Sequence, residues 1–351
     1  MKREGHAVPG LDVKAFEAGI GWLKLFRMPR FACWWLTISL CAADLRVIDV
    51  QKIWDAAPHN AFTDLAHFRG HWYCVFREAS THVSADGKLR IIRSRDGRRW
   101  ASAALIEDSR GDLRDAKLAI NQRGELMLVG AVAFQPPGRH RHQSLVWFSR
   151  DGLQWSPAQD VADADYWLWR ATFSKGLALG IGYTTNLPAS DRSIRLYESR
   201  DDGRTFQTLV DRLEVRDYPN ESAIRFRRDG KAICLLRRDP GHGMVGTASP
   251  PYRQWTWREL DRRIGGPNLI EMPDGRWLAA VRLYEGKSTY TALAWLDVER
   301  ATLTEFLKLP SGGDNSYPGL VVRNGELWVS YYSSHELRTS IYLARVQIPR
   351  R

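Results

Sequence analysis

The stretch Ser94-Arg-Asp-Gly-Arg-Arg-Trp100 recurs twice further along the chain, as Ser149-Arg-Asp-Gly-Leu-Gln-Trp155 and Ser199-Arg-Asp-Asp-Gly-Arg-Thr-Phe206. Each copy follows an apolar, strand-like run, and the first serines lie 55 and 50 residues apart. A fourth segment, from Ser249 to Trp255 or Trp257, is a degenerate copy at the same spacing. The pattern is that of a hairpin turn, because Asp accepts backbone N–H bonds across the loop and Gly adopts positive φ. A repeat of this length indicates stacked supersecondary units.

A second repeat interleaves with the first and consists of two apolar strands joined by a polar turn. Its turn glycines are Gly70, Gly124, Gly176, Gly230, Gly275 and Gly325. Six units of about 50 residues, each with room for three or four short strands, predict an all-β fold, a six-bladed β-propeller. The last unit shows three strands, so we expect residues 45–54 to supply its fourth strand and close the ring. Residues 44–351 would then form a single propeller domain.

Composition supports a globular protein and says little about its partner. The chain has 351 residues, of which 44% are hydrophobic and 26% charged, with a net charge of +11. These values exclude a disordered, collagen-like or polytopic membrane chain. The positive charge favours an anionic partner. We expect no nucleic-acid binding, because neither a basic run nor a recognised module is present.

Residues 1–43 form an N-terminal extension with a different character. From Met28 to Ala43, Arg30 precedes an apolar run that small residues follow, which is the pattern of a secretory signal peptide with the true start at Met28. A secreted or periplasmic protein is expected on this basis, and a cytoplasmic one if the segment is instead a buried N-terminal helix. The run is too short to span a bilayer, so no stable membrane insertion is expected. Cys74 and Cys234 lie in apolar strands and are expected in the core.

Arginine recurs at one position of the six units. The residues seven places after the turn glycines are Arg77, Ala131, Tyr183, Arg237, Arg282 and Tyr332. Three guanidinium groups converging on the ring axis would form a clamp for a carboxylate or phosphate, because the planar fork matches those groups. The alternative is a set of paired surface arginines.

The Asp-containing turns resemble the Asp boxes of sialidases and other bacterial-neuraminidase-repeat proteins, and the resemblance extends over residues 45–348. Such turns are structural and lie on the outer rim of a propeller. The resemblance implies a nucleophilic Tyr317 activated by Glu221, with Arg237 and Arg282 holding the substrate. A carboxylate partner is needed because phenol has a pKa near 10.

The pattern departs from the sialidases in the first blade. Asn60 stands where the first arginine of the sialidase triad would be, and Arg77 is the candidate to replace it. The following loop offers Glu78 and His82 as polar candidates, and a histidine can act as a general acid or base near neutral pH. In the second blade, Arg114 and Asp115 lie at the same entry position as Glu221 and are expected to face the central channel.

These features predict an exo-acting glycoside hydrolase whose substrate is a glycan that ends in an acidic sugar. No cofactor and no metal are expected, because the sequence has no zinc-type His/Cys spacing. One alternative is a carbohydrate lyase on the same propeller, with His82 or Tyr317 as the base. Another is a non-catalytic glycan- or protein-binding propeller, in which Glu221 and Tyr317 would not meet. The aromatic run 166–169 is either a sugar-stacking platform or part of the core.

Overall fold

The computed structural model describes residues 45–185 and 187–348. The chain divides into two units, Met1–Ala42 and Ala43–Arg351, and the fold concerns the second. The predicted signal peptide lies outside the described residues and stays a prediction. In the part of the chain that the structure describes, no helix is long and apolar enough to cross a membrane.

Six antiparallel four-stranded sheets form the unit. The first blade contains β2 (His59–Phe68), β3 (His71–Ala79), β4 (Lys88–Ser94) and β5 (Ala101–Ile106). The second contains β6 (Gly111–Ile120), β7 (Leu126–Phe134), β8 (His142–Ser149) and β9 (Gln159–Val161). The third contains β10 (Tyr166–Ser174), β11 (Leu177–Thr184), β12 (Ile194–Ser199) and β13 (Gln207–Val210), with the short 3₁₀ helix η1 (Ala189–Asp191) between β11 and β12.

The remaining blades follow the same order. The fourth contains β14 (Pro219–Phe226), β15 (Ala232–Arg238), β16 (Met244–Ala248) and β17 (Thr256–Glu259). The fifth contains β18 (Gly265–Glu271), β19 (Trp277–Glu285), β20 (Ser288–Asp297) and β21 (Thr302–Lys308). The sixth contains β22 (Asn315–Arg323), β23 (Glu326–Ser333), β24 (Ser340–Gln347) and, from the other end of the described chain, β1 (Arg46–Trp54).

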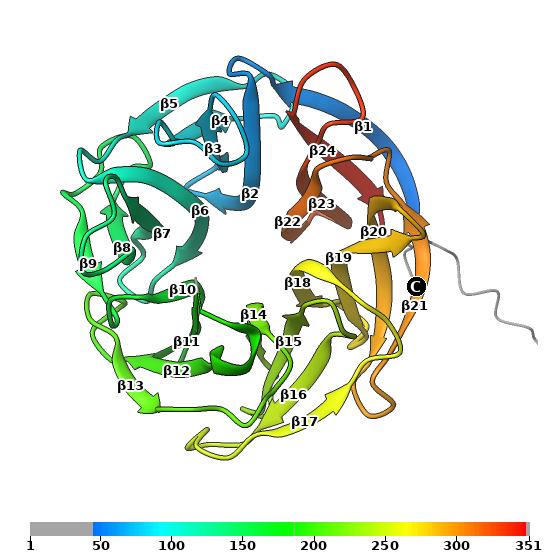
Figure 1. The fold of residues 1–351 in the computed structure, drawn as a ribbon. Helices are drawn as coiled ribbons and strands as arrows, with labels where there is room; N and C mark the ends of the chain where they lie inside the picture. Colours follow the sequence, from blue (N-terminus) through cyan, green and yellow to red (C-terminus); the bar gives the residue numbers. More distant parts are fainter. Residues whose placement is uncertain (1–44, 186, 349–351) are drawn as a thin grey trace, which may run out of the picture. The chain divides into compact units, whose positions relative to one another are not determined.

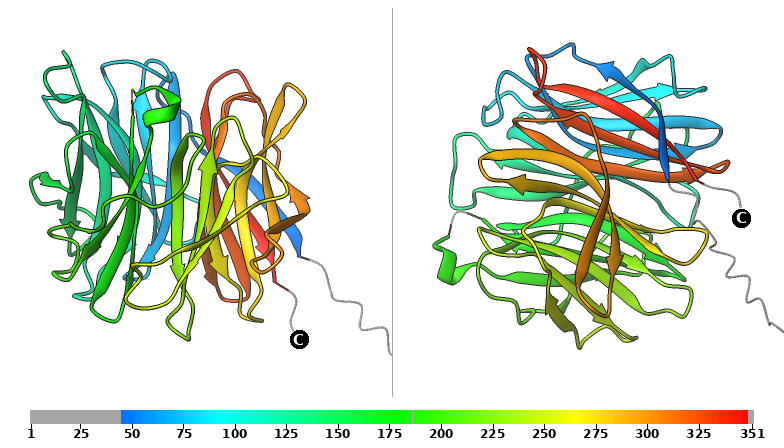
Figure 2. Two further views of the ribbon diagram at one scale, coloured as in Figure 1. Left: turned by 60° about the horizontal axis from the view of Figure 1, so that its bottom comes forward. Right: turned by 90° about the vertical axis from the view of Figure 1, so that its right-hand side faces the viewer.

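The ring closes as the sequence predicts, because β1 pairs antiparallel with β24 from Arg46 opposite Gln347 to Trp54 opposite Ile341. Figure 1 shows the six blades around a central axis, with the first strand of each blade innermost. The side views in Figure 2 show the strands running between the two faces of the ring. The prediction of an all-β, six-bladed β-propeller is confirmed. Cys74 and Cys234 are buried and free, as expected for core residues.

The repeated Asp turns join the third and fourth strands at the outer edge, and in the first three blades they pack against the preceding blade. In the first of them, Asp96 Oδ1 accepts the N–H groups of residues 98 and 99, and Ser94 Oγ accepts that of Gly97 at 2.9 Å. Gly97 has φ +70°, and a Cβ there would lie 2.3 Å from the ring of Trp328 in the sixth blade. Only glycine therefore allows the turn to pack on the adjacent blade. The fifth blade has a related turn that the sequence pattern missed, in which Asp297 Oδ1 accepts two N–H groups.

Every innermost strand has a register shift at the same height, and these shifts position the site. They fall between Ala61/Asp64, Arg114/Lys117, Leu168/Ala171, Pro219/Ser222, Gly265/Asn268 and Ser316/Gly319. A bulge breaks the alternation of side chains and re-aims them. The bulged segments contain Phe62, Asp115, Trp169, Glu221, Gly266 and Tyr317. Each blade thus has a bulged segment at a similar position of its innermost strand.

A buried polar network joins the first three blades. Asp64 of β2 accepts two bonds from Arg170 of β10, at 2.8 and 3.3 Å, and one from the Leu118 N–H of β6 at 2.8 Å. Because this carboxylate is 1% exposed, it depends on these partners for the solvation that water would otherwise provide.

Candidate active site

Tyr317 and Glu221 meet at the axis, although 96 residues separate them. The phenol hydroxyl donates a short hydrogen bond to Glu221 Oε1. Tyr317 is 8% exposed and packs against the rings of Phe62, Trp169 and Tyr332. Burial, and next the charge of Glu221, raise the pKa of Tyr317 well above its usual value. At neutral pH the residue is therefore a phenol whose proton points at a carboxylate.

Gly266 holds this pair in place from the fifth blade. Its N–H donates to the other oxygen of Glu221, Oε2, at 2.9 Å. Its φ is +53°, and a Cβ would lie 2.8 Å from Tyr317 Cδ2. Glycine is thus required both for the backbone conformation and for the close approach. Pattern analysis did not select this residue, because a glycine that acts through its backbone has no chemical signature.

Arg237 lies beside the pair and balances its charge. Its Nη1 donates to Glu221 Oε1 at 2.9 Å and approaches the Tyr317 hydroxyl at 3.4 Å. Its Nε forms an ion pair with Asp239 Oδ2 at 2.7 Å. Among the described residues, Nη2 has no hydrogen-bond partner. One nitrogen of the fork is thus free for a ligand.

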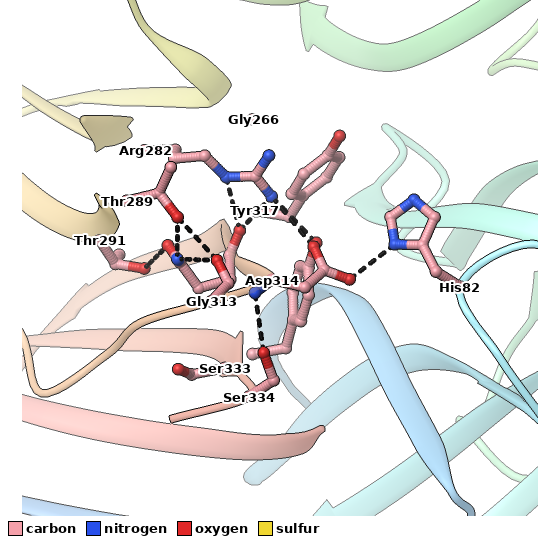
Figure 3. Close-up of polar contacts among 12 residues, drawn as sticks. His82, Gly266, Arg282, Thr289, Thr291, Gly313, Asp314, Tyr317, Ser333 and Ser334 are labelled. Carbon is pink, nitrogen blue, oxygen red and sulfur yellow. Dashed lines mark hydrogen bonds and ion pairs between the residues drawn. The ribbon is translucent and has the colours of Figure 1, made fainter. Parts of the chain in front are cut away.

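Arg282 also lies beside Tyr317, with its guanidinium carbon 5.4 Å from the ring centroid. Its Nε donates to the Asn315 carbonyl at 2.9 Å, and its Nη2 donates to the Tyr332 hydroxyl at 3.0 Å. Figure 3 shows Arg282 beside Tyr317, with Asp314 between Arg282 and His82. Within the described part of the chain, Nη1 of Arg282 has no partner. The structure thus brings two of the three predicted arginines to the nucleophile candidate.

Asp115 also belongs to this group. It lies on the bulge of β6 with φ +56° and is 8% exposed. Burial raises its pKa, and the charge of Glu221 acts in the same direction, whereas Arg114 and Lys117 oppose the shift. A carboxyl group that stays protonated to higher pH can act as a general acid.

Lys117 is a charged residue that the sequence analysis missed, because a lone lysine on a strand has no motif. It is 2% exposed, and its ammonium lies 4.7 Å from the ring centroid of Trp169 and 5.7 Å from that of Tyr317. Its hydrogen bonds go to two backbone carbonyls, those of Ala116 and Thr63. Burial lowers the pKa of Lys117 to about 8.

We expect Lys117→Met to stabilise the protein at pH 7. The folded-state pKa is about 8 against an ordinary 10.5, so the buried ammonium lowers stability below pH 8. Between these values the unfolded chain binds the extra proton, so the free energy of unfolding rises with pH. Removing the charge should raise that free energy by about 1–3 kcal/mol at pH 7, with a smaller gain at pH 10. Denaturant titrations of wild type and variant at both pH values measure this. A variant less stable than wild type at pH 7 would show that the ammonium is favourably paired.

Arg77 does not join the other two arginines. It is fully buried, and its Nε donates to Asp112 Oδ1 at 2.8 Å. Its terminal nitrogens donate to the Thr81 carbonyl at 2.8 Å and to Ser84 Oγ at 3.0 Å. All three nitrogens are therefore engaged inside the protein, and the geometry does not support the predicted substrate contact. Arg77 anchors the loop between β3 and β4.

Asn60 and Glu78 are likewise engaged in structural contacts. Asn60 is fully buried, and its amide donates to the carbonyls of Ala57 and Thr339 at 2.8 and 2.9 Å. Glu78 accepts bonds from Trp54 of β1 at 2.6 Å and from Arg90 of β4 at 3.0 Å. Neither side chain is directed to the nucleophile pair, so the predicted substrate-binding roles have no support in this geometry.

Arg114 and His82 lie nearer the candidate site. The Arg114 guanidinium stacks over Phe62 at 5.2 Å and reaches Asp112 at 3.4 Å. His82 is exposed, and its Nδ1 lies 2.6 Å from Asp314 Oδ2. The same oxygen lies 3.1 Å from His59 Nε2. His59, His82 and Asp314 form the cluster among the described residues that could hold a metal ion.

The aromatic run 166–169 belongs to the core. Trp169 is 1% exposed, and its ring contacts Tyr317 at 5.4 Å in an edge-on arrangement. Of the two alternatives that the sequence left open, packing is therefore the one that the structure supports. Trp169 packs against the nucleophile candidate, and because it is buried it offers no stacking surface to a sugar.

No protein-family model and no curated protein match the sequence. Solved structures do match in fold. A protein of unknown function from Dyadobacter fermentans superposes with a TM-score of 0.77 at 18% identity, over 87% of this chain and 99% of that one. An α-L-arabinanase from Penicillium chrysogenum gives 0.64 at 13% identity, over 86% and 98% of the two chains. The sialidase of Trypanosoma rangeli gives 0.62 at 11% identity, over 86% of this chain but 57% of the sialidase.

Two of these similar structures, the arabinanase and the sialidase, are glycoside hydrolases. At such low identities the likeness shows the fold alone. Any activity must therefore be argued from the side chains at the axis.

Proposed function

We propose that this propeller is a sialidase-like exo-glycoside hydrolase that acts on glycans with a terminal acidic sugar. The observation that carries the proposal is the hydrogen bond from the Tyr317 hydroxyl to Glu221. A buried phenol bonded to a carboxylate, with two arginines beside it, is the arrangement that a tyrosine nucleophile needs. Most glycoside hydrolases use a pair of carboxylates, and sialidases are an exception because their nucleophile is a tyrosine.

In the proposed reaction Glu221 takes the phenol proton as Tyr317 Oη attacks the anomeric carbon. The glycosidic bond breaks, and the leaving oxygen receives a proton from Asp115. Water, whose proton Asp115 takes, then attacks the anomeric carbon, and Tyr317 Oη leaves and regains its proton from Glu221, so the anomeric configuration is retained overall. A neutral nucleophile avoids the repulsion that a carboxylate nucleophile would meet from an acidic sugar.

The proposed specificity for an acidic sugar rests on Arg237 and Arg282. Both flank Tyr317, and each has one terminal nitrogen without a partner among the described residues. Guanidinium nitrogens donate strong, charge-assisted hydrogen bonds to a carboxylate. Their side chains are 15% and 13% exposed, so part of each remains accessible to a ligand.

The proposal is tested by turnover of a panel of fluorogenic glycosides of sialic, uronic and neutral sugars, with wild-type protein. Cleavage of an acidic glycoside and not of its neutral counterpart supports it. Exclusive cleavage of a neutral sugar, an unsaturated product that absorbs in the near ultraviolet, or no turnover by folded protein would each contradict it.

Asp115→Asn should separate leaving-group protonation from attack. For a glycan leaving group we expect kcat/KM, which reports the first step alone, to fall by about 100-fold, because proton donation contributes that much. For a phenolic leaving group of low pKa the loss should be under about 10-fold, since little protonation is needed. The raised pKa of Asp115 places the alkaline limb of the wild-type pH profile above the ordinary Asp range, and the variant should lose that limb. Equal losses on both substrates would assign the proton donor elsewhere.

A further inference from the structure

Three potential metal ligands converge at the edge of the candidate site from segments far apart in the sequence. His59 is the first residue of β2, His82 lies in the loop between β3 and β4, and Asp314 immediately precedes β22. One oxygen, Asp314 Oδ2, is 3.1 Å from His59 Nε2 and 2.6 Å from His82 Nδ1. All the ligand atoms lie within 4.8 Å of one another. We propose that His59, His82 and Asp314 bind a divalent transition-metal ion, with Zn²⁺ as the reference ion.

The donor set selects the class of metal. Two imidazoles and one carboxylate suit borderline ions such as Zn²⁺, whereas Ca²⁺ and Mg²⁺ prefer oxygen ligands. Zinc bonds to nitrogen and oxygen near 2.1 Å place neighbouring ligands in a tetrahedron roughly 3.4 Å apart. The His59 contact is already close to that spacing. The His82 contact must lengthen by under about 1 Å, which an exposed loop side chain can supply.

The surroundings of Asp314 orient it for this role. Its other oxygen, Oδ1, accepts the Tyr332 hydroxyl at 2.7 Å and lies 3.5 Å from Arg282 Nη2. Oδ2 is thereby directed to the two histidines, as Figure 3 shows for His82. Such outer contacts typically fix the orientation of a ligating carboxylate.

Three protein ligands leave a coordination position open, as in catalytic rather than structural zinc sites. Because Asp314 also contacts Arg282, the ion would lie next to a proposed substrate arginine. If the proposed function holds, the open position would take a carboxylate or hydroxyl oxygen of the acidic sugar. That last step depends on the proposed function, whereas metal binding itself does not.

The test is calorimetric titration of Zn²⁺ into chelator-treated, untagged protein, with Co²⁺ absorption as a second readout of the ligand geometry. We expect one ion per chain in wild type and affinity at least about 100-fold lower in His82→Ala and Asp314→Asn. His82 is exposed, so His82→Ala should fold normally. The matched control is His140→Ala, which removes another exposed histidine paired with an aspartate, Asp165 at 2.8 Å, and should bind as wild type does.

Absence of binding by wild type, or binding that is unchanged in both cluster variants, would overturn the proposal. Loss of binding in the control variant would also overturn it, because the ion would then lie elsewhere. The proposed function and the proposed metal site can be refuted independently of each other. Zinc binding without glycoside turnover would refute the proposed function alone, and turnover by a wild-type protein that does not bind zinc would refute the metal site alone.

Discussion

Tyr317→Phe should lower kcat by a thousandfold or more, equivalent to about 4 kcal/mol of transition-state stabilisation. The change removes one oxygen, the proposed nucleophile, and leaves the ring among Phe62, Trp169 and Tyr332. The fold should be unaffected, so the loss should appear in kcat with little change in KM. Steady-state kinetics on the best acidic glycoside, with thermal unfolding as the check of folding, measure both quantities.

The matched control for this prediction is Tyr331→Phe, one residue before Tyr332 on β23. Its hydroxyl is also part-buried and donates to the Pro310 carbonyl at 2.9 Å, outside the site. This variant should retain turnover within a few-fold of wild type. If Tyr317→Phe retained similar turnover, Tyr317 would not be the nucleophile.

Arg77→Met should destabilise the folded protein by about 3 kcal/mol, because breaking this buried ion pair leaves Asp112 with only its 3.4 Å contact to Arg114. Asp112 is 2% exposed, and it would lose its 2.8 Å partner. The loop that carries His82 would also lose its anchors at Thr81 and Ser84. Denaturant unfolding measures the loss.

A double variant provides the control for this second prediction. Replacing Asp112 by Leu as well removes the stranded charge, so Arg77→Met/Asp112→Leu should recover part of the lost stability. If Arg77→Met instead unfolds like wild type but loses only substrate affinity, Arg77 is a substrate residue after all, and the structural assignment given to it is wrong.

The fold could be predicted from sequence because its signal is local. The six turn glycines all adopt φ between +70° and +88°, where a side chain is disfavoured. Each blade therefore carries a glycine that can be recognised in the sequence at a regular spacing. Ring closure follows from the same count, since the last blade lacks a strand that only the N-terminal segment can provide. Tertiary pairing of β1 with β24 confirms it.

The candidate site was less predictable, because partners across the axis decide what each residue does. Arg77 and Arg282 occupy the same position in their blades, opposite Ala61 and Gly265 respectively. Arg77 meets an aspartate of the next blade, whereas Arg282 reaches the ring of Tyr317. The sequence pattern of a single blade cannot distinguish these two arginines, because their partners lie in other blades.

The histidine cluster was missed for a related reason. His59 and Asp314 are 255 residues apart, so no ligand spacing in the sequence could bring them together, and the expectation of no metal rested on such spacings. The bulges of the inner strands, which direct Asp115, Glu221 and Tyr317 to the axis, are equally invisible to a count of alternating residues.

The central claim is that Tyr317 forms a covalent bond to the sugar. The most direct measurement is intact-mass spectrometry and peptide mapping after incubation with a glycosyl fluoride of the acidic sugar that carries a second fluorine next to the anomeric carbon. Such a probe slows hydrolysis of the glycosyl-enzyme more than its formation. We expect one adduct per chain, mapped to Tyr317 and absent from Tyr317→Phe. An adduct on any other residue, or turnover that inverts the anomeric centre without an adduct, would contradict it.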